Sequence, residues 1–210
     1  MPGYNTAMEV ETLRDRGLAF DPELVVVGIC GNDLDLPNFL LHSPDYWALS
    51  TSFLAEWVVS TLRGWDTQAM RPLVGAPRAG HGSPAGEDDL DQVPAHLRDL
   101  VGLPAFERAL DELAALATEH EFDVVVSTLY RVNEPLRSRI TARGFAIVEG
   151  ESIVRERMAD GTMTDADRPR LQLHEWDPHP SELGHEIEAE ALYRHLSESG
   201  WIAEQLLRPR

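Results

Sequence analysis

Two largely apolar runs constrain the fold of this chain more than any other feature. Residues Leu24–Cys30 read LVVVGIC, and residues Phe122–Leu129 read FDVVVSTL. A strand with one face in water alternates apolar and polar residues, whereas a strand buried on both faces is apolar throughout, as in parallel sheets covered by helices. The two runs therefore predict buried parallel strands, and the shorter run Phe145–Val148 predicts a third.

Helical patterns fall before, between and after these runs. We expect helices from the capping box Thr6–Glu9 to Gly17, over about 104–120 and 135–143, and from near Ser181 to Gly200. Strands that alternate with helices predict a three-layer α/β/α fold around a parallel sheet. Three strands are few for such a sheet.

Composition narrows the class of protein. The 210 residues, 43% of them hydrophobic, suit a single domain over 1–210, with a Pro-, Gly- and acid-rich insertion at about 71–94. The 18 basic residues are all arginine, and against 36 acidic residues they leave a net charge of −18, which disfavours nucleic-acid binding. The absence of lysine excludes Schiff-base chemistry and a P-loop. Cys30 is the only cysteine, and no apolar run is long enough to span a membrane.

The segment "HEWDPHPSELGHE", residues 174–186, sets three histidines among several carboxylates. One interpretation is a metal site built on His179 and His185, but the spacing matches no compact motif, and two prolines bend the chain. A second is catalytic: Asp177 orients His179, which acts as a general base. The third is a solvated acidic loop that caps the last helix through Ser181. Taken alone, the segment favours the acidic loop.

Two further stretches complete a pattern. The stretches "PGYNTAMEVETL", "DPELVVVGICGND" and "DPHPSELGH" occur in this order and together resemble the SGNH (GDSL) hydrolase family over nearly the whole chain. The resemblance implies a flavodoxin-like sheet and acyl-ester hydrolysis by a Ser-His-Asp triad, without metal or organic cofactor. It implies that His179 is the general base and Asp177 its orienting acid, and that the Gly3 N–H and the Asn32 side chain form the oxyanion hole.

The chain also departs from the family pattern. Cys30 stands two residues before Asn32, where the family usually has glycine, and Trp176 stands three residues before His179, where the acid is more common; Glu175 is the alternative acid. No Gly-Asp-Ser block occurs. Ser83, in the insertion, has glycines nearby but neither the G-x-S-x-G pattern nor a strand before it. We read His185 as a packing or capping residue of the last helix.

These observations give two hypotheses. The first is an ester hydrolase that acts on a small-molecule, lipid or glycan acyl ester and is complete only with an N-terminal segment that carries two strands and the serine; the chain by itself is then expected to be inactive. The second is a non-catalytic α/β binding module. The sequence fixes neither the ester nor the cellular location.

Overall fold

The computed structural model describes residues 4–30, 33–34, 95–174 and 177–207. The chain divides into two compact units. One contains residues 1–5 and 31–106, and the other contains residues 6–30 and 107–210. The predicted insertion at 71–94, with Ser83, lies outside the described residues, as do Gly3 and Asn32.

The larger unit is built on a parallel sheet of three strands in the order β1-β2-β3. These are β1 (Leu24–Gly28), β2 (Asp123–Thr128) and β3 (Ala146–Glu149). Val26 pairs with Val125 in the register of the first pair, and Val126 pairs with Ile147 in the second. The three predicted strands and their parallel direction are confirmed.

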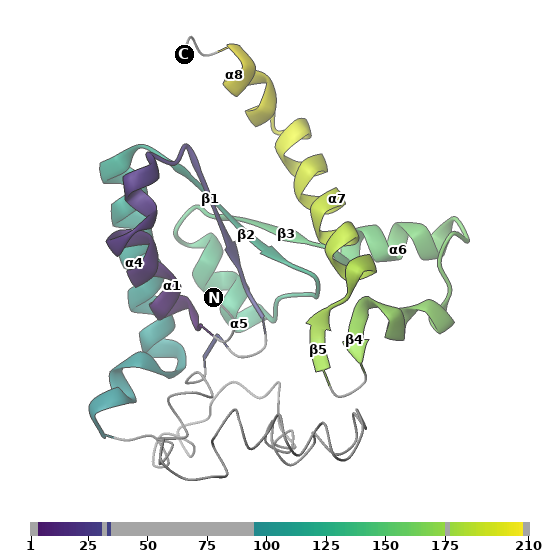
Figure 1. The fold of residues 1–210 in the computed structure, drawn as a ribbon, viewed down its shortest axis with the longest axis horizontal. Helices are drawn as coiled ribbons and strands as arrows, with labels where there is room; N and C mark the ends of the chain where they lie inside the picture. Colours follow the sequence, from purple (N-terminus) through teal and green to yellow (C-terminus); the bar gives the residue numbers. More distant parts are fainter. Residues whose placement is uncertain (1–3, 31–32, 35–94, 175–176, 208–210) are drawn as a thin grey trace, which may run out of the picture. The chain divides into compact units, whose positions relative to one another are not determined.

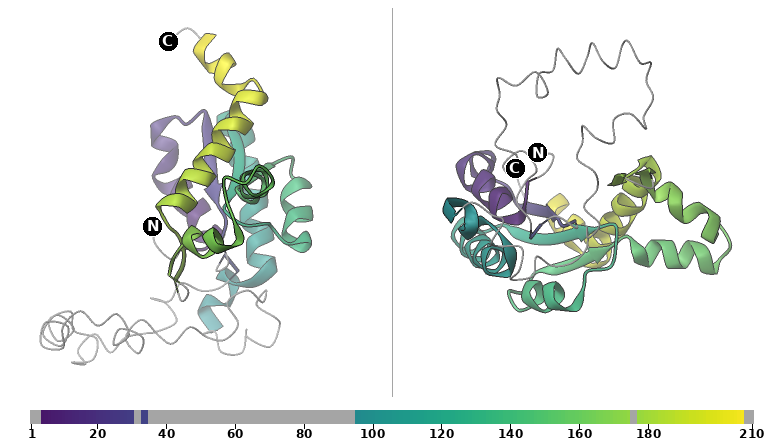
Figure 2. Two further views of the ribbon diagram at one scale, coloured as in Figure 1. Left: turned by 90° about the vertical axis from the view of Figure 1, so that its right-hand side faces the viewer. Right: turned by 90° about the horizontal axis from the view of Figure 1, so that it is seen from below.

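Four helices cover the two faces of this sheet. They are α1 (Thr6–Asp15), α4 (Gly102–His120), α5 (Glu134–Thr141) and α7 (Glu182–Glu198). Figure 1 shows α1 and α4 side by side, with α7 on the other side of the sheet. The ion pair Arg14–Glu112 joins α1 to α4, and Arg139–Glu107 joins α5 to α4. Arg143, two residues after α5, pairs with Asp111 of α4. The helices over both faces agree with the predicted α/β/α layering, and Figure 2 shows them from two further sides.

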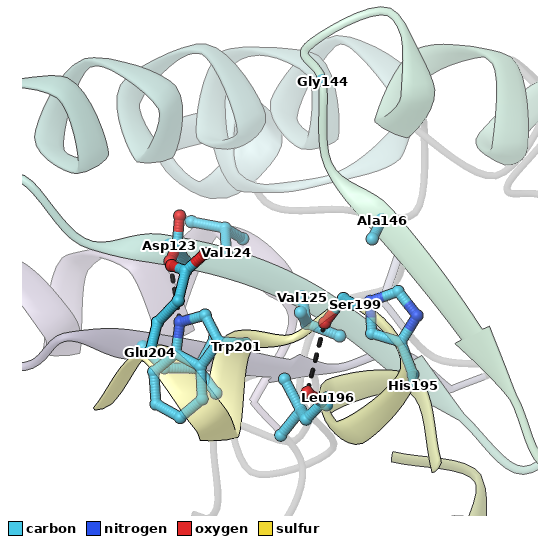
Figure 3. A pocket seen from close by; sticks show the side chains of 11 residues that line it. Asp123, Val124, Val125, Gly144, Ala146, His195, Leu196, Ser199, Trp201 and Glu204 are labelled. Carbon is cyan, nitrogen blue, oxygen red and sulfur yellow. Dashed lines mark hydrogen bonds between the residues drawn. The ribbon is translucent and has the colours of Figure 1, made fainter. Parts of the chain in front are cut away.

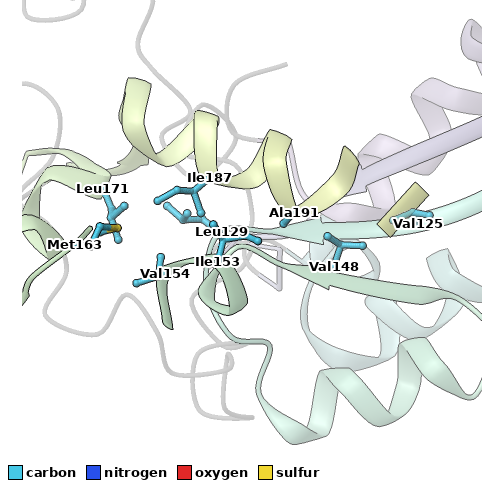
Figure 4. Packing of buried hydrophobic residues seen from close by; sticks show 9 residues of the cluster. All are labelled: Val125, Leu129, Val148, Ile153, Val154, Met163, Leu171, Ile187 and Ala191. Carbon is cyan, nitrogen blue, oxygen red and sulfur yellow. The ribbon is translucent and has the colours of Figure 1, made fainter. Parts of the chain in front are cut away.

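The hydrophobic core beneath α7 holds the two layers together. Val125 and Val148 of the sheet pack with Ile187 and Ala191 of α7 (Figure 4). Alternate residues of a strand point to opposite faces, so Val124 and Val126 lie toward α4 and α5, and both are buried. The helix expected from near Ser181 to Gly200 therefore packs onto the sheet through Ile187 and Ala191.

The first strand differs from the prediction. Leu24–Cys30 was expected to be buried on both faces, but Val26 is 43% exposed, and Gly28 and Cys30 are exposed. The reason is position: β1 stands at the end of the order and, among the described strands, pairs with β2 alone. The central strand β2 is buried along its length after Asp123, as predicted.

Several further elements follow the sheet. Helix α6 (Glu151–Ala159) begins directly after β3, and a 3-10 helix spans Asp165–Leu171. Strands β4 (Gln172–His174) and β5 (Asp177–Pro180) then form an antiparallel pair, and α8 (Trp201–Leu207) follows α7. None of the described helices is both long and apolar enough to cross a membrane.

The smaller unit contributes short described segments. Asn5 is buried, and its Nδ2 donates a hydrogen bond to the Leu100 carbonyl at 2.7 Å. The Gly102 N–H donates to the Leu34 carbonyl at 2.8 Å. Leu100 ends a 3-10 helix (Ala95–Leu100), and Gly102 begins α4. The segments 4–5 and 33–34, far apart in sequence, are therefore both attached to residues 100–102.

Candidate active site

His179 lies in β5, immediately before the N-terminus of α7, and it is exposed to solvent. The strand β5 pairs with β4 so that Gln172 is opposite Pro180 and His174 is opposite Asp177. The sequence indicated only a turn or a loop here, because prolines at 178 and 180 cannot donate ladder hydrogen bonds. A short two-stranded pair tolerates them, since proline is accepted on edge strands.

The residue after β5 fixes the start of α7. The Ser181 hydroxyl accepts a hydrogen bond from the Gly184 N–H at 3.2 Å, as an N-cap residue does. The same hydroxyl donates to the Arg170 carbonyl, and the Ser181 N–H donates to the Leu171 carbonyl at 2.9 Å. Ser181 therefore joins three segments: β5, α7 and the end of the 3-10 helix. The predicted N-cap is confirmed.

Gly184 allows the first turn of α7 to approach the sheet closely. A Cβ at position 184 would lie 2.5 Å from the Leu171 carbonyl oxygen, 3.0 Å from Cβ of Pro180 and 3.2 Å from Cδ2 of Leu129. Leu129 directly follows β2. The N-terminus of α7 is therefore packed against the carboxyl end of the central strand, and His179 is held five residues before this contact.

The carboxyl end of β3 is packed in the same way. A Cβ at Gly150, the residue after β3, would lie 3.1 Å from Cγ2 of Ile187 and 3.1 Å from the Leu129 carbonyl oxygen. In open parallel sheets, ligands bind beyond the carboxyl ends of the strands. The segment that carries His179 is thus anchored at the edge where a ligand is expected.

Position 177 is the first residue of β5, opposite His174. The register shifts between this pair and the Gln172–Pro180 pair, so that three residue steps in β5 oppose two in β4, as at a β-bulge. The backbone therefore brings positions 177 and 179 into one short strand, but it does not assign them to one face by regular alternation. Glu175, the alternative acid, lies outside the described residues.

The two candidate oxyanion residues, Gly3 and Asn32, also lie outside the described residues, but their neighbours do not. Asn5 and Leu34, near Gly3 and Asn32 in the sequence, are bonded to Leu100 and Gly102, respectively. Asp33, next to Asn32, is 4% exposed. The chain around each candidate is therefore attached to one short segment of the smaller unit.

A polar cluster not predicted from the sequence surrounds the end of β2. It comprises Tyr130, Gln172, His185 and Glu188. Burial raises the pKa of Tyr130, whose hydroxyl is hydrogen-bonded to Gln172, and the charge of Glu188 acts in the same direction. Burial also raises the pKa of the Glu188 carboxyl, and His185 opposes this rise. The only sequence signal for the cluster is that Tyr130 follows a buried strand.

The exposed ring of His185 faces Glu188 across a distance of 3.8 Å between Nδ1 and Oε2. Its backbone N–H donates to the Ser181 carbonyl within the first turn of α7. The imidazole is thus placed beside a carboxylate one turn along the helix, and 70% of the side chain remains exposed.

The described serines do not supply an evident nucleophile. Ser127, near the end of β2, is buried. Five other described serines donate their hydroxyl hydrogen to a backbone carbonyl: Ser138, Ser152, Ser181, Ser197 and Ser199. A hydroxyl must be free to reach both a base and a substrate before it can attack.

The histidine-rich segment 174–186 is also a candidate metal site. Within the described ranges, no group of three or more His, Cys, Asp or Glu side chains is arranged to hold a metal ion. The side chain of Asp177 is outside this description.

A hollow of about 260 Å³ lies at the opposite, amino end of the strands (Figure 3). Its lining includes Leu24 and Asp123, at the starts of β1 and β2, and Trp201 of α8. The Trp201 indole N–H donates to Asp123 Oδ2 at 2.7 Å, which fastens α8 to the sheet. The hollow and His179 therefore lie at opposite ends of the strands.

Comparisons of the chain with protein-family models, with curated proteins and with solved structures found no match.

Proposed function

We propose that this chain carries the histidine part of an SGNH-type ester hydrolase, with His179 as the general base and Asp177 as its orienting acid. The observation that supports the proposal is the anchoring of α7: Gly184 packs against Leu129, and His179 precedes this contact at the carboxyl edge of a parallel sheet. This is the edge at which a catalytic base would meet a bound ester.

The chemistry requires a serine hydroxyl supplied by the complete form of the protein. His179 takes the hydroxyl proton as the serine attacks the acyl carbonyl, and it later returns that proton to the leaving alcohol. A carboxylate at position 177 orients the imidazole and stabilises its charged form. The Gly3 N–H and the Asn32 amide donate hydrogen bonds to the oxyanion, where one donor contributes ~10²–10³ in rate.

The attachment of segments 4–5 and 33–34 to residues 100–102 supports the assignment of the oxyanion residues. The residues that follow Gly3 and those that follow Asn32 are both bonded to the segment 100–102. Two donors can act on one oxygen only if their backbones are held near each other.

A non-catalytic α/β binding module is the second candidate. The observation that favours it concerns the described serines. Five of them donate a hydroxyl hydrogen bond to a backbone carbonyl, and the sixth, Ser127, is buried. Such a module would use the same edge of the sheet to bind a ligand without cleaving it.

The genomic DNA directly upstream separates the two candidates. An in-frame segment with a Gly-Asp-Ser block supports the hydrolase, and a stop codon without such a block supports the binding module. The matching biochemical test compares ester hydrolysis by the 210-residue chain and by the chain with its upstream segment. Hydrolysis is expected only in the second, and its absence from both contradicts the proposal.

A further inference from the structure

Arg131 stands apart from the other described arginines. Each of the others makes at least one hydrogen bond, ion pair or similar contact. Arg131 makes none within the part of the chain that the structure describes, and it is exposed. In a chain whose acidic residues outnumber its basic residues by 36 to 18, a guanidinium without a carboxylate partner is unexpected.

The backbone on both sides of Arg131 is fixed. On one side, the Tyr130 N–H donates to Thr128 Oγ1 at 3.3 Å, and the Tyr130 hydroxyl is bonded to Gln172. On the other side, the N–H of the buried Val132 donates to Glu149 Oε1 at 2.7 Å. Arg131 therefore extends from a preorganised loop. Preorganisation lowers the entropy cost of ordering the loop when a ligand binds.

This loop adjoins the hairpin that carries His179. Leu129, two residues before Arg131, lies against Gly184, which also lies against Pro180. Gln172, the partner of Tyr130, is opposite Pro180 in the β4–β5 pair. Both the loop and the hairpin are therefore at the carboxyl end of β2.

Two described carboxylates near this loop already have partners. Glu149 accepts from the Val132 N–H and from the Arg137 guanidinium, and Glu188 faces His185. Glu134 is three residues from Arg131 and exposed, and the structure does not pair them. An exposed pair of that kind is worth only about 0–1 kcal/mol, so it would not prevent a ligand from binding.

A guanidinium presents a planar fork of N–H donors that matches a carboxylate or a phosphate group. The net charge of −18 opposes the approach of an anion over long distances. Salt screens this repulsion beyond about 8–10 Å, whereas contact with the fork is short-range. A small anionic group can therefore bind at Arg131 despite the acidity of the whole chain.

We propose that Arg131 is a specificity residue that binds an anionic group, carboxylate or phosphate, on the ester substrate. The inference rests on the proposed function, since it names the class of ester that the same edge accepts. The ester bond would lie toward His179, and the anionic group would lie toward the loop after β2.

The test measures binding, so that it does not depend on a nucleophile. Monomethyl succinate and methyl succinamate are nearly isosteric methyl esters, and they differ by a carboxylate in place of a carboxamide. Each is titrated into the ¹⁵N-labelled chain and followed by NMR, and inorganic phosphate is titrated in the same way. Tighter binding of phosphate than of monomethyl succinate indicates a phosphate-bearing ester, and the reverse order indicates a carboxylate-bearing one.

We expect the chain to bind monomethyl succinate more tightly than methyl succinamate. Arg131→Gln should weaken binding of the anionic ester by about tenfold, the effect of losing a hydrogen bond to a charged group. Arg131→Lys should weaken it less, because it keeps the charge but not the fork. The matched control is Arg155→Gln, an exposed arginine of α6 whose bond goes to the Glu151 carbonyl, and it should change nothing.

The inference would be overturned if neither monomethyl succinate nor phosphate bound, if the two esters bound equally and phosphate did not bind, or if anion binding were unchanged in Arg131→Gln. The proposed function is assessed separately, by hydrolysis of the neutral ester in the complete form. Hydrolysis that depends on His179 but shows no anion preference keeps the function and rejects the role of Arg131. Anion binding at Arg131 without any hydrolysis rejects the function instead.

Discussion

Gly184 and Leu171 approach so closely that a methyl group at position 184 would lie 2.5 Å from the Leu171 carbonyl oxygen. The contact joins the first turn of α7 to the end of the 3-10 helix, and the Ser181 N–H donates to the same carbonyl. The position of His179 depends on this junction, because β5 leads directly into it.

Gly184→Ala should destabilise the fold. The atom that a new Cβ meets is backbone, which cannot move without displacing β4 or α7, and overpacking of this kind typically costs about 1–3 kcal/mol. Equilibrium urea denaturation measures the change in the free energy of unfolding. The control is Gly28→Ala, since a Cβ at position 28 meets nothing within 4 Å. Equal stability of both variants would show that the junction is looser than described.

Ser181→Ala should remove the N-cap of α7 and the hydroxyl bond to Arg170. Loss of a serine N-cap typically costs about 1 kcal/mol. Ser197→Ala is a suitable control, because Ser197 is exposed and its hydroxyl donates within the helix, to Tyr193; its effect should stay within about 0.5 kcal/mol. Thermal denaturation of the three proteins compares them, and a larger loss in Ser197→Ala would contradict the capping role.

The stability of the protein should depend on the ionisation of Glu188. Burial raises the pKa of this carboxyl in the folded state. Its contribution to stability is therefore most favourable below its pKa in the unfolded chain, about 4.3, and is lost as the pH rises through its pKa in the folded state. Glu188→Gln should therefore be more stable than the parent at pH 7, and the difference should shrink near pH 3. A difference that is independent of pH would show that Glu188 has an ordinary pKa in the folded state.

The sequence predicts the sheet better than the surroundings of His179. The run Val124–Leu129 is buried as expected, because a central strand has neighbours on both sides. The same kind of run in β1 leaves Val26 exposed, since burial depends on what packs beside a strand and not on its own residues. The β4–β5 pair was not foreseen, because a four-residue strand with two prolines carries no strand signal of its own.

The candidate site, like the fold, can be predicted from the sequence only in part. His179 is a candidate base through the family resemblance, whereas the N-cap Ser181 follows from local sequence. The cluster of Tyr130, Gln172 and Glu188 does not, because its members come from three separate segments that only tertiary packing brings together. The lack of a carboxylate partner for Arg131 among the described residues is likewise a property of the folded chain. Residue type alone does not reveal it.

The acid of the proposed triad can be assigned by two substitutions in the complete form. Asp177→Asn should strongly reduce kcat by leaving the imidazole wrongly oriented, as in other triads. Glu175→Gln should have little effect. The reverse result, with Asp177→Asn at the parent rate and Glu175→Gln inactive, would move the acid role to Glu175. Initial rates of ester hydrolysis at saturating substrate measure both.

The most direct test of the account is the dependence of ester hydrolysis on His179. The assay uses methyl butyrate, an unactivated ester, because exposed imidazoles attack activated p-nitrophenyl esters without a triad. With an upstream Gly-Asp-Ser segment present, we expect turnover that His179→Ala abolishes. His120→Ala, which alters an exposed histidine at the end of α4, should leave it unchanged. Turnover that persists in His179→Ala would contradict the assignment of His179 as the general base.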